Sequence, residues 1–304
     1  MSFSRRLFLQ SASATLGAAL LDGSLLPPDE LEKTLNEIRA NLLEMINEER
    51  EVEKVPPLKV DELATQVATK HALEMAGDEF ASHWGRDGRK PYHRYSLAGG
   101  VHATQENVSA ADNTWSMKVS DLKQDVAYLH VRLYQEKPPH DGHRRAILAP
   151  QHTHVGFGLA VDKLRLRLVE LFVAKYLEVE PIKRKAKPGD KLTFAARMPK
   201  EGYYLNTVEV FYEPLPQTPE LSWLRQPRSY ALPSESEVLR PRVPPPFMYA
   251  DRKPGVIEMS LSGRFTTPIR LFKPDPGIYT IVTWLRRADS VKAFPATEIC
   301  IEAS

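Results

Sequence analysis

The residues best suited to chemistry are histidines, gathered in one stretch of the chain. All nine lie between His71 and His154, and none follows. A neutral imidazole can bind a divalent ion such as zinc, while a nearby carboxylate binds the ion or orients a bound water. The lone cysteine, Cys300, excludes an internal disulfide and a cysteine-based zinc site. Histidines with carboxylates therefore indicate either a weak, open metal site or hydrogen-bonded pairs that shape a metal-free pocket.

These histidines lie among predicted helices. One helix is predicted from Asp29, whose side chain can cap its first turn, to a stop at Pro56-Pro57. A second helix follows Asp61 and carries a row of small side chains, which lets a neighbouring element approach closely. The small residues are Ala64, Ala68 and Ala72.

A third helix and a hairpin complete this part of the chain. Apolar residues recur at helical spacing over 121–136, and alternation over 153–160 and 164–173 predicts a β-hairpin. His71 and His130 lie inside the second and third helices and are expected to be structural. Helices followed by antiparallel strands predict an α+β sandwich.

The beginning of the chain resembles an export signal. Its residues 4–10, S-R-R-L-F-L-Q, are similar to the twin-arginine pattern S-R-R-x-F-L-K, with Gln10 in the last position. The apolar stretch that follows, to about Leu21, is too short and too polar to hold a membrane span. We expect 1–26 to be a twin-arginine signal peptide, which a receptor reads and which is not an anchor. The expected location is periplasmic or extracellular, and the alternative for this segment is an amphipathic helix.

The end of the chain has the composition of a β module. From Pro181 onward it holds 17 of the 25 prolines, and prolines favour turns. We expect a linker over 179–187 and an all-β, immunoglobulin-like sandwich over 188–304. The strand-like runs are 191–197, 208–212, 256–261, 278–285 and 297–302.

Four aromatic residues of this module permit two interpretations. They mark a binding face, or they belong to the core and edges of an ordinary sandwich. They are Tyr203, Tyr204, Trp223 and Phe247.

Four segments of the first part, in this order, resemble one known family. They are "NLLEMINEEREVEKVPPLKVDELATQVATKHALEMA", "FASHWGRDGRKPYHRY", "QENVSA" and "DGHRRAILAPQHTHVGFGLA". Together they resemble the CAP superfamily of cysteine-rich secretory, antigen 5 and pathogenesis-related 1 proteins, in its bacterial form with an SCP-like domain, over 30–178. The resemblance implies an α-β-α sandwich whose central cavity is lined by two histidines and two glutamates.

The resemblance assigns these pocket residues one by one. His83 matches the first histidine, Glu106 the first glutamate and His143 the second histidine. Glu136 lies where eukaryotic members carry the second glutamate, which bacterial members often lack. His83 and His143 are the candidate ligands for one divalent metal, Zn or Mg, although the pocket can also work without metal.

The function that the resemblance implies is open between two classes. Family members bind lipids, sterols or protein partners, and some have been linked to hydrolysis. We expect an exported protein of the cell envelope that binds a small molecule, lipid or protein, without a transmembrane anchor in the mature chain. The alternative is a metal-dependent hydrolase with Glu106 as general base. The formal charge of +2, from 41 basic and 39 acidic residues, gives no overall field that points to nucleic acid or an anionic membrane.

Overall fold

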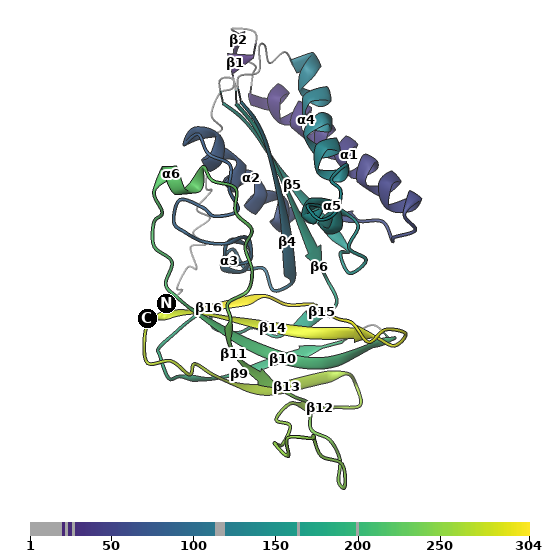
Figure 1. The fold of residues 1–304 in the computed structure, drawn as a ribbon, viewed down its shortest axis with the longest axis vertical. Coiled ribbons are helices and arrows are strands. Elements are labelled where there is room, and N and C mark those ends of the chain that lie inside the picture. The colour runs from purple at the N-terminus through teal and green to yellow at the C-terminus, as the bar shows by residue number, and fades with distance from the viewer. Residues whose placement is uncertain (1–19, 22–23, 26–27, 113–118, 163–164, 199–200) are drawn as a thin grey trace, which may run out of the picture.

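A computed structural model describes most of the chain, and the predicted signal peptide lies almost wholly outside the described residues (Figure 1). Near the start, β1 (Leu20–Leu21) pairs with β2 (Ser24–Leu25). Within the described part, no helix combines the length and the apolar character needed to cross a membrane. The described residues are 20–21, 24–25, 28–112, 119–162, 165–198 and 201–304.

The first part is a four-stranded sheet between two layers of helices (Figure 1). Successive residues of one strand serve opposite faces: Leu168 packs with one helix layer and Val169 with the other. The predicted mixture of helices and strands is confirmed. The strands, in sheet order, are β3 (Lys59–Val60), β5 (His154–Asp162), β6 (Arg165–Ala174) and β4 (Ala103–Asp112).

The helices are divided between the two faces of this sheet. One hydrophobic cluster joins α1, α4 and α5 to the sheet, and another joins α2 to its opposite face. The Pro56-Pro57 pair follows the end of α1, as predicted. The helices are α1 (Pro28–Val52), α2 (Glu62–Gly77), α3 (Pro91–Leu97), α4 (Val119–Tyr134) and α5 (Gly142–Ile147).

The row of small residues on α2 lets this helix lie directly against β5. Ala64 and Ala68 are fully buried, and the facing residues of β5 are Gly156 and Gly158. A Cβ atom added at Gly158 would lie 2.1 Å from the carbonyl oxygen of Ala68, which is backbone and cannot swing away. The close approach predicted for this row is confirmed.

We therefore expect Gly158→Ala to lower the free energy of unfolding by about 2–3 kcal/mol, the usual cost of forcing extra volume into a packed core. Urea unfolding followed by circular dichroism measures the effect. Gly77→Ala is the matched control, because a Cβ atom there meets nothing within 4 Å. Equal losses of stability in the two variants would contradict the prediction.

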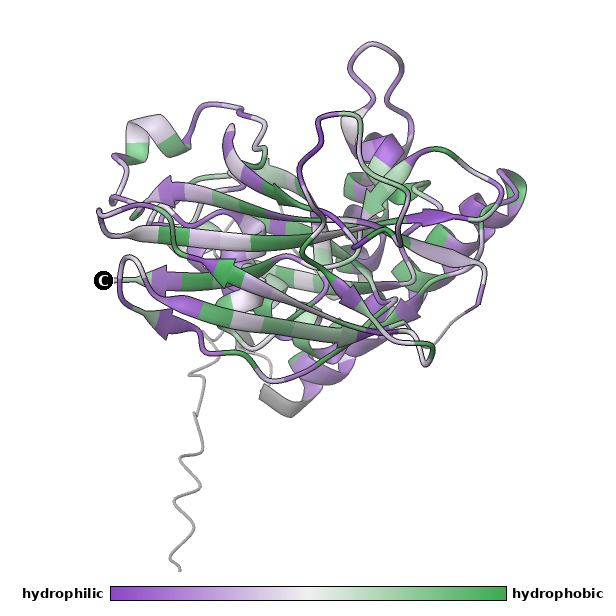
Figure 2. Ribbon diagram, turned by 90° about the horizontal axis from the view of Figure 1, so that it is seen from below, coloured by the Kyte–Doolittle hydropathy of each residue, from purple (hydrophilic) through white to green (hydrophobic). Residues whose placement is uncertain are grey.

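The second part contains two sheets that share one hydrophobic core (Figure 2). Their pairing is antiparallel except between β16 and β8. The first sheet has the order β11-β10-β14-β16-β8, with β15 paired to β14. Its strands are β11 (Glu235–Leu239), β10 (Tyr203–Pro214), β14 (Gly277–Arg287), β16 (Ile299–Ala303), β8 (Lys185–Ala186) and β15 (Ala293–Pro295).

The second of these sheets contains a strand that the sequence pattern did not predict. Only two residues of the predicted run 256–261 form a strand, whereas β13 contains Pro268. The pairing of β13 with β12 ends at Thr266, so at Pro268 the strand pairs only with β9. The missing N–H of the proline therefore costs no hydrogen bond to β12. The strands are β12 (Glu258–Met259), β13 (Arg264–Arg270), β9 (Lys191–Arg197) and β7 (Glu178–Val179).

Helix α3 joins the two parts through polar contacts. Glu213 of β10 receives hydrogen bonds from Lys90 Nζ at 2.7 Å and Tyr92 Oη at 2.8 Å, and His93 Nε2 lies 3.0 Å away. Burial alone would raise the pKa of Glu213, but His93 and Lys90 outweigh it and lower the pKa to about 2. Ser96 adds a contact, because its Oγ accepts a hydrogen bond from the backbone of β16 at 2.7 Å. The residues predicted as a linker include β8, which belongs to this second part.

Candidate functional site

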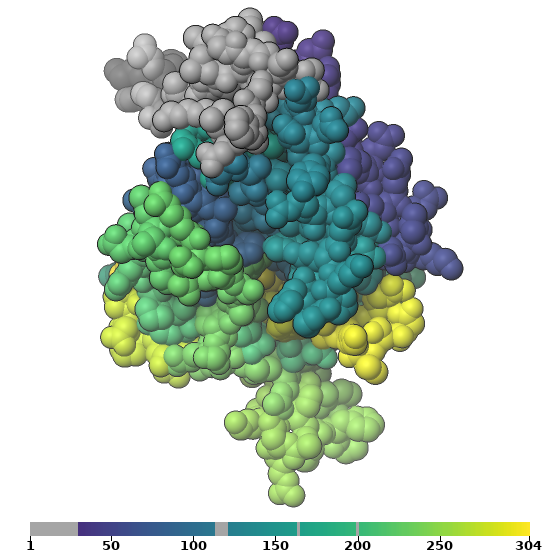
Figure 3. All heavy atoms as spheres, turned by 45° about the horizontal axis from the view of Figure 1, so that its top comes forward, coloured from purple at the N-terminus to yellow at the C-terminus, as the bar shows by residue number. Residues whose placement is uncertain are grey.

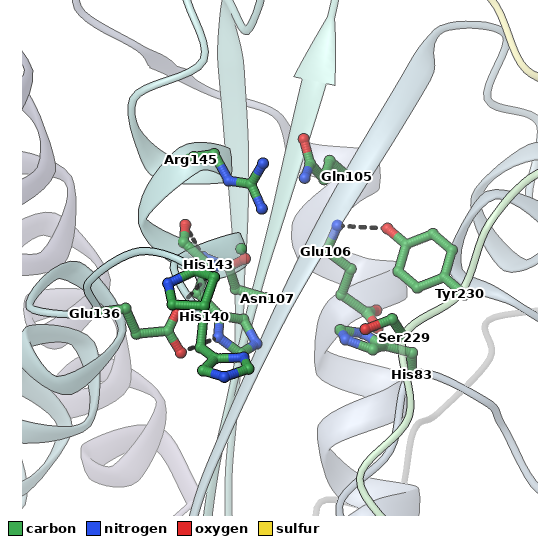
Figure 4. Close-up of a pocket in the computed structure, with 12 residues that line it drawn as sticks. His83, Gln105, Glu106, Asn107, Glu136, His140, His143, Arg145, Ser229 and Tyr230 are labelled. Atoms are coloured by element: carbon green, nitrogen blue, oxygen red, sulfur yellow. Dashed lines mark hydrogen bonds and ion pairs between the residues drawn. The ribbon is translucent and has the colours of Figure 1, made fainter.

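The predicted site residues lie around one cavity of about 370 Å³ at an edge of the first sheet (Figure 4). They come from four places in the chain: the loop after α2, strand β4, the loop after α4, and the start of α5. The C-terminal part also contributes to the wall. The lining residues include His83, Gln105, Glu106, Asn107, Glu136, Pro139, His143, Arg145 and Tyr230.

His83 and Glu106 form the more buried half of the site. His83 Nδ1 lies 3.0 Å from Glu106 Oε1, and Arg94 Nη2 donates to Glu106 Oε2 at 2.6 Å. Arg94 Nη1 also donates to the carbonyl oxygen of His83 at 2.7 Å, so one guanidinium fixes both residues. Burial alone would raise the pKa of Glu106, but the charge of Arg94 and the hydrogen bond from His83 lower it to about 2. Glu106 is therefore an ionised, immobile partner for the imidazole.

His143 and Glu136 form the more open half. His143 Nδ1 lies 2.6 Å from Glu136 Oε1, and the backbone N–H of His143 donates to Glu136 Oε2 at 3.0 Å. The two side chains are 33% and 24% exposed, compared with 13% for His83 and 1% for Glu106. The structure thus pairs Glu136, the second glutamate, with His143 just as it pairs Glu106 with His83.

The two imidazoles leave their other nitrogens unengaged. Their ring centroids are 6.4 Å apart with the planes tilted by 33°, and within the described residues no hydrogen bond reaches the Nε2 atom of either ring. A carboxylate on Nδ1 that leaves Nε2 for a metal is the usual arrangement of metal-binding histidines. In the described part of the chain, no three His, Cys, Asp or Glu side chains converge as ligands. The described side chains therefore offer a metal ion at most the two imidazole nitrogens, and water or a ligand would have to supply the other donors.

Beneath the pocket, a buried polar chain connects the site to the core. The Asn107 amide donates to the carbonyl oxygen of His143 at 3.2 Å and to Glu170 Oε2 at 3.1 Å. Glu170 Oε1 lies 2.6 Å from His130 Nδ1, and Glu49 lies 2.9 Å from His130 Nε2. His130 is fully buried, so it belongs to the core. The contacts that it makes there, however, were not predicted from the sequence.

Tyr230 is a pocket residue that sequence reasoning missed. Its hydroxyl accepts a hydrogen bond from the backbone N–H of Glu106 at 2.8 Å, and its ring meets the edge of the His83 ring at 4.9 Å. Burial and the charge of Glu106 raise the pKa of Tyr230, so the hydroxyl keeps its proton. Tyr230 lies in the proline-rich stretch after α6 (Leu221–Leu224), where no periodic pattern distinguishes it. Only the fold brings it to His83.

The same stretch decides the role of one predicted aromatic residue. Trp223 packs edge-on against Trp84, with ring centroids 5.2 Å apart. It is therefore a contact between the two parts of the chain and not a free binding face. Phe247, by contrast, is 71% exposed.

The comparisons with known proteins concern mainly the first part. A profile of the Cysteine-rich secretory protein family (CAP) matches residues 43–176. The chain is 22% identical over 179 residues to Cilia- and flagella-associated protein 184 of Tetrahymena thermophila, a match that covers 59% of this chain and 21% of that protein. The chain thus spans only about a fifth of that relative's length.

Two solved structures are similar over about half of the chain. One is an extracellular protein containing a SCP domain from Bacillus anthracis str. Ames, with 23% identity, coverage of 50% of this chain and 45% of that chain, and a TM-score of 0.39. The other is an outer surface protein from Borrelia burgdorferi, with 17% identity, coverage of 45% of this chain and 92% of that chain, and a TM-score of 0.36. The profile match and the four ordered motifs together identify the first part of the chain, over residues 43–176, as a domain of the CAP superfamily.

Proposed function

We propose that this chain is a binding protein whose CAP pocket holds a small, oxygen-rich ligand, with His83 and His143 able to hold one divalent ion such as Zn, which imidazole nitrogens suit. The observation that carries the proposal is the pair of His–Glu hydrogen bonds on opposite walls of one cavity. Each glutamate orients its ring and leaves Nε2 for an ion or a ligand.

The chemistry of the walls supports a polar ligand over a lipid or sterol. Hydrogen-bond donors surround the cavity, among them the amide of Gln105, the guanidinium of Arg145 and the hydroxyl of Tyr230. Pro139 is the main aliphatic contribution, whereas pockets for apolar ligands are lined mostly by apolar side chains. The volume of about 370 Å³ suits a small molecule. A ligand with carboxylate or phosphate oxygens would meet these donors.

The protein groups divide the work of binding. A bound divalent ion would supply positive charge for a ligand oxygen. Glu106 and Glu136 keep the Nδ1 side of each imidazole engaged, and Arg94 prevents Glu106 from turning into the cavity. Tyr230 accepts from the backbone of Glu106 and keeps its own proton, which it can donate to a ligand.

Binding is favoured over hydrolysis because of the state of Glu106. A general base works best with a pKa near the working pH, whereas the pKa of Glu106 is about 2 and both of its oxygens already accept hydrogen bonds. Its side chain is 1% exposed, which leaves little room for an attacking water. A hydrolase built on Glu106 would therefore begin with a weak base.

Titration of the full chain with Zn²⁺ by isothermal calorimetry tests the metal-binding half of the proposal. We expect one ion per chain in the wild type and loss of binding in His83→Ala and in His143→Ala. Glu136→Gln should weaken binding by about 10–100-fold, because it retains the ligand ring and disturbs only its orientation. His154→Gln, outside the cavity, should bind as the wild type does. Unchanged binding in both alanine variants would place the metal elsewhere.

The wider setting of the protein is also a proposal. We infer that residues 1–26 direct export by the twin-arginine route, which the S-R-R-L-F-L-Q segment supports. We further infer that the second part is an immunoglobulin-like sandwich, which its two facing, mostly antiparallel sheets support. Through Tyr230, this second part completes the CAP pocket as well as following it in the chain.

A further inference from the structure

The second part carries a loop that projects away from the rest of the molecule. Residues 240–256 connect β11 to β12 and extend outward (Figures 1 and 3). The base of the loop is closed by backbone hydrogen bonds, from Val256 N to Arg240 O at 2.9 Å and from Arg242 N to Ile257 O at 2.9 Å. A Cβ atom at Gly255 would lie 1.9 Å from the oxygen of Pro241, so the two arms touch. The projecting loop therefore has a defined conformation, because its two arms contact each other and hydrogen-bond at the base.

The tip of this loop presents two apolar side chains to solvent. Phe247 is 71% exposed and Met248 is 69% exposed. The next residue, Tyr249, folds back: its hydroxyl donates to Pro241 O at 2.8 Å, and the Arg240 guanidinium lies over its ring at 5.1 Å. The loop thus uses one aromatic ring for its own structure and leaves Phe247 and Met248 outside.

The loop is also basic, unlike the chain as a whole. Between 240 and 255 it carries four cations and one anion, Asp251, a formal charge of +3. Arg240 pairs with Asp251 at 2.8 Å and Arg242 lies 3.4 Å from Glu258. Among the described residues, no carboxylate lies within ion-pair distance of the side chains of Arg252 or Lys253. Two positive charges without a direct ion pair therefore lie beside an exposed apolar tip.

We propose that this loop docks the protein on an anionic lipid bilayer. Phe247 and Met248 enter the boundary between headgroups and acyl chains, and Arg252 and Lys253 face lipid phosphates. A few apolar side chains flanked by basic ones suit an interfacial membrane contact. A stable protein partner instead needs about 800 Å² on each side, far more than two side chains offer. The proposal does not depend on what the CAP pocket binds.

Co-sedimentation of the full chain with lipid vesicles tests the proposal. We expect binding to vesicles of phosphatidylglycerol and phosphatidylcholine, little binding to pure phosphatidylcholine, and weakening by added salt. Phe247→Ser with Met248→Ser should lower the partition coefficient at least about tenfold. Arg252→Ser with Lys253→Ser should lower it about 25-fold, since each basic residue near an anionic surface contributes about fivefold.

Control variants at other exposed apolar side chains distinguish binding through the loop from non-specific adsorption to vesicles. Tyr204→Ser with Val291→Ser removes apolar side chains that are 52% and 93% exposed elsewhere on the same part, and should bind as the wild type does. In Phe247→Trp, we expect the indole fluorescence to shift to shorter wavelength on anionic vesicles. If the full chain does not bind anionic vesicles, the proposal is wrong; a loop that binds a protein partner would give that result. Equal binding to neutral vesicles, or loop variants that bind like the wild type, would also overturn the proposal.

Discussion

Arg50→Met is expected to lower the free energy of unfolding by about 3–5 kcal/mol, because it strands several buried carbonyl groups. Arg50 lies in the last turn of α1 and is fully buried. Its guanidinium donates to the carbonyl oxygens of Pro56 at 2.7 Å, Ile147 at 2.5 Å, Ala149 at 3.2 Å and His152 at 3.2 Å. Methionine fills a similar volume but donates nothing, and each orphaned carbonyl costs about 1–3 kcal/mol. The substitution has no comparable cost in the unfolded chain, because water forms hydrogen bonds with these carbonyl groups there.

Urea unfolding of the full chain measures this effect. Arg132→Met is the matched control, because Arg132 is an exposed arginine of α4, and its replacement should change stability by less than about 0.5 kcal/mol. Arg50→Lys should fall between the two, since one ammonium cannot reach four carbonyls in the plane of a guanidinium. The loss should also reach the pocket, because three of the stranded carbonyls lie at the end of α5 or just after it, and α5 contains His143. They belong to Ile147, Ala149 and His152. Equal stability of Arg50→Met and wild type would contradict the argument.

The sequence predicted best the features that are local in the chain. The row of alanines on α2 indicated a close contact between the helix and a neighbouring element, and in the fold this row packs against Gly156 and Gly158 of β5. Similarly, the motifs around His83, Glu106 and His143 are short segments whose residues and order together carried the resemblance. Their convergence on one cavity lies in the fold, and the sequence could only imply it through a family.

The sequence could not predict polar side chains that are buried although their residue type and neighbours in the chain are typical of exposed positions. Arg50 stands in the polar run N-E-E-R-E-V-E-K and is indistinguishable there from an exposed helix arginine. Tyr230 reaches Glu106 across 124 positions, from a proline-rich stretch without periodicity. Buried charged side chains do not recur at a regular spacing in the sequence, because a charge is buried only where the fold provides it with partners.

The buried partners of His130 give this histidine an unusual charge. Burial alone would lower its pKa, but Glu170 and Glu49 outweigh burial and raise it to about 10, above the 6.5 of an ordinary imidazole. A pKa that is higher in the folded chain means that folding takes up a proton. The stabilisation from His130 is therefore complete below about pH 6.5 and is lost as the pH rises through about 10. Burial also raises the pKa of Glu298, to about 8, so its titration changes the stability over the same pH range. The effect of His130 is therefore measured as the difference between the wild type and a His130 variant, both of which contain Glu298.

His130→Leu is accordingly expected to lower the free energy of unfolding by about 3–5 kcal/mol near pH 6, because Glu170 then keeps a buried charge without its cation. The difference from wild type should shrink as the pH is raised towards 10, while the contribution of Glu298 cancels between the two proteins. Urea unfolding at several pH values measures the trend. A difference that stays constant would mean that His130 is neutral in the fold. Because Asn107 links Glu170 to the backbone of His143, a charged His130 would also make the pocket and the core parts of one network.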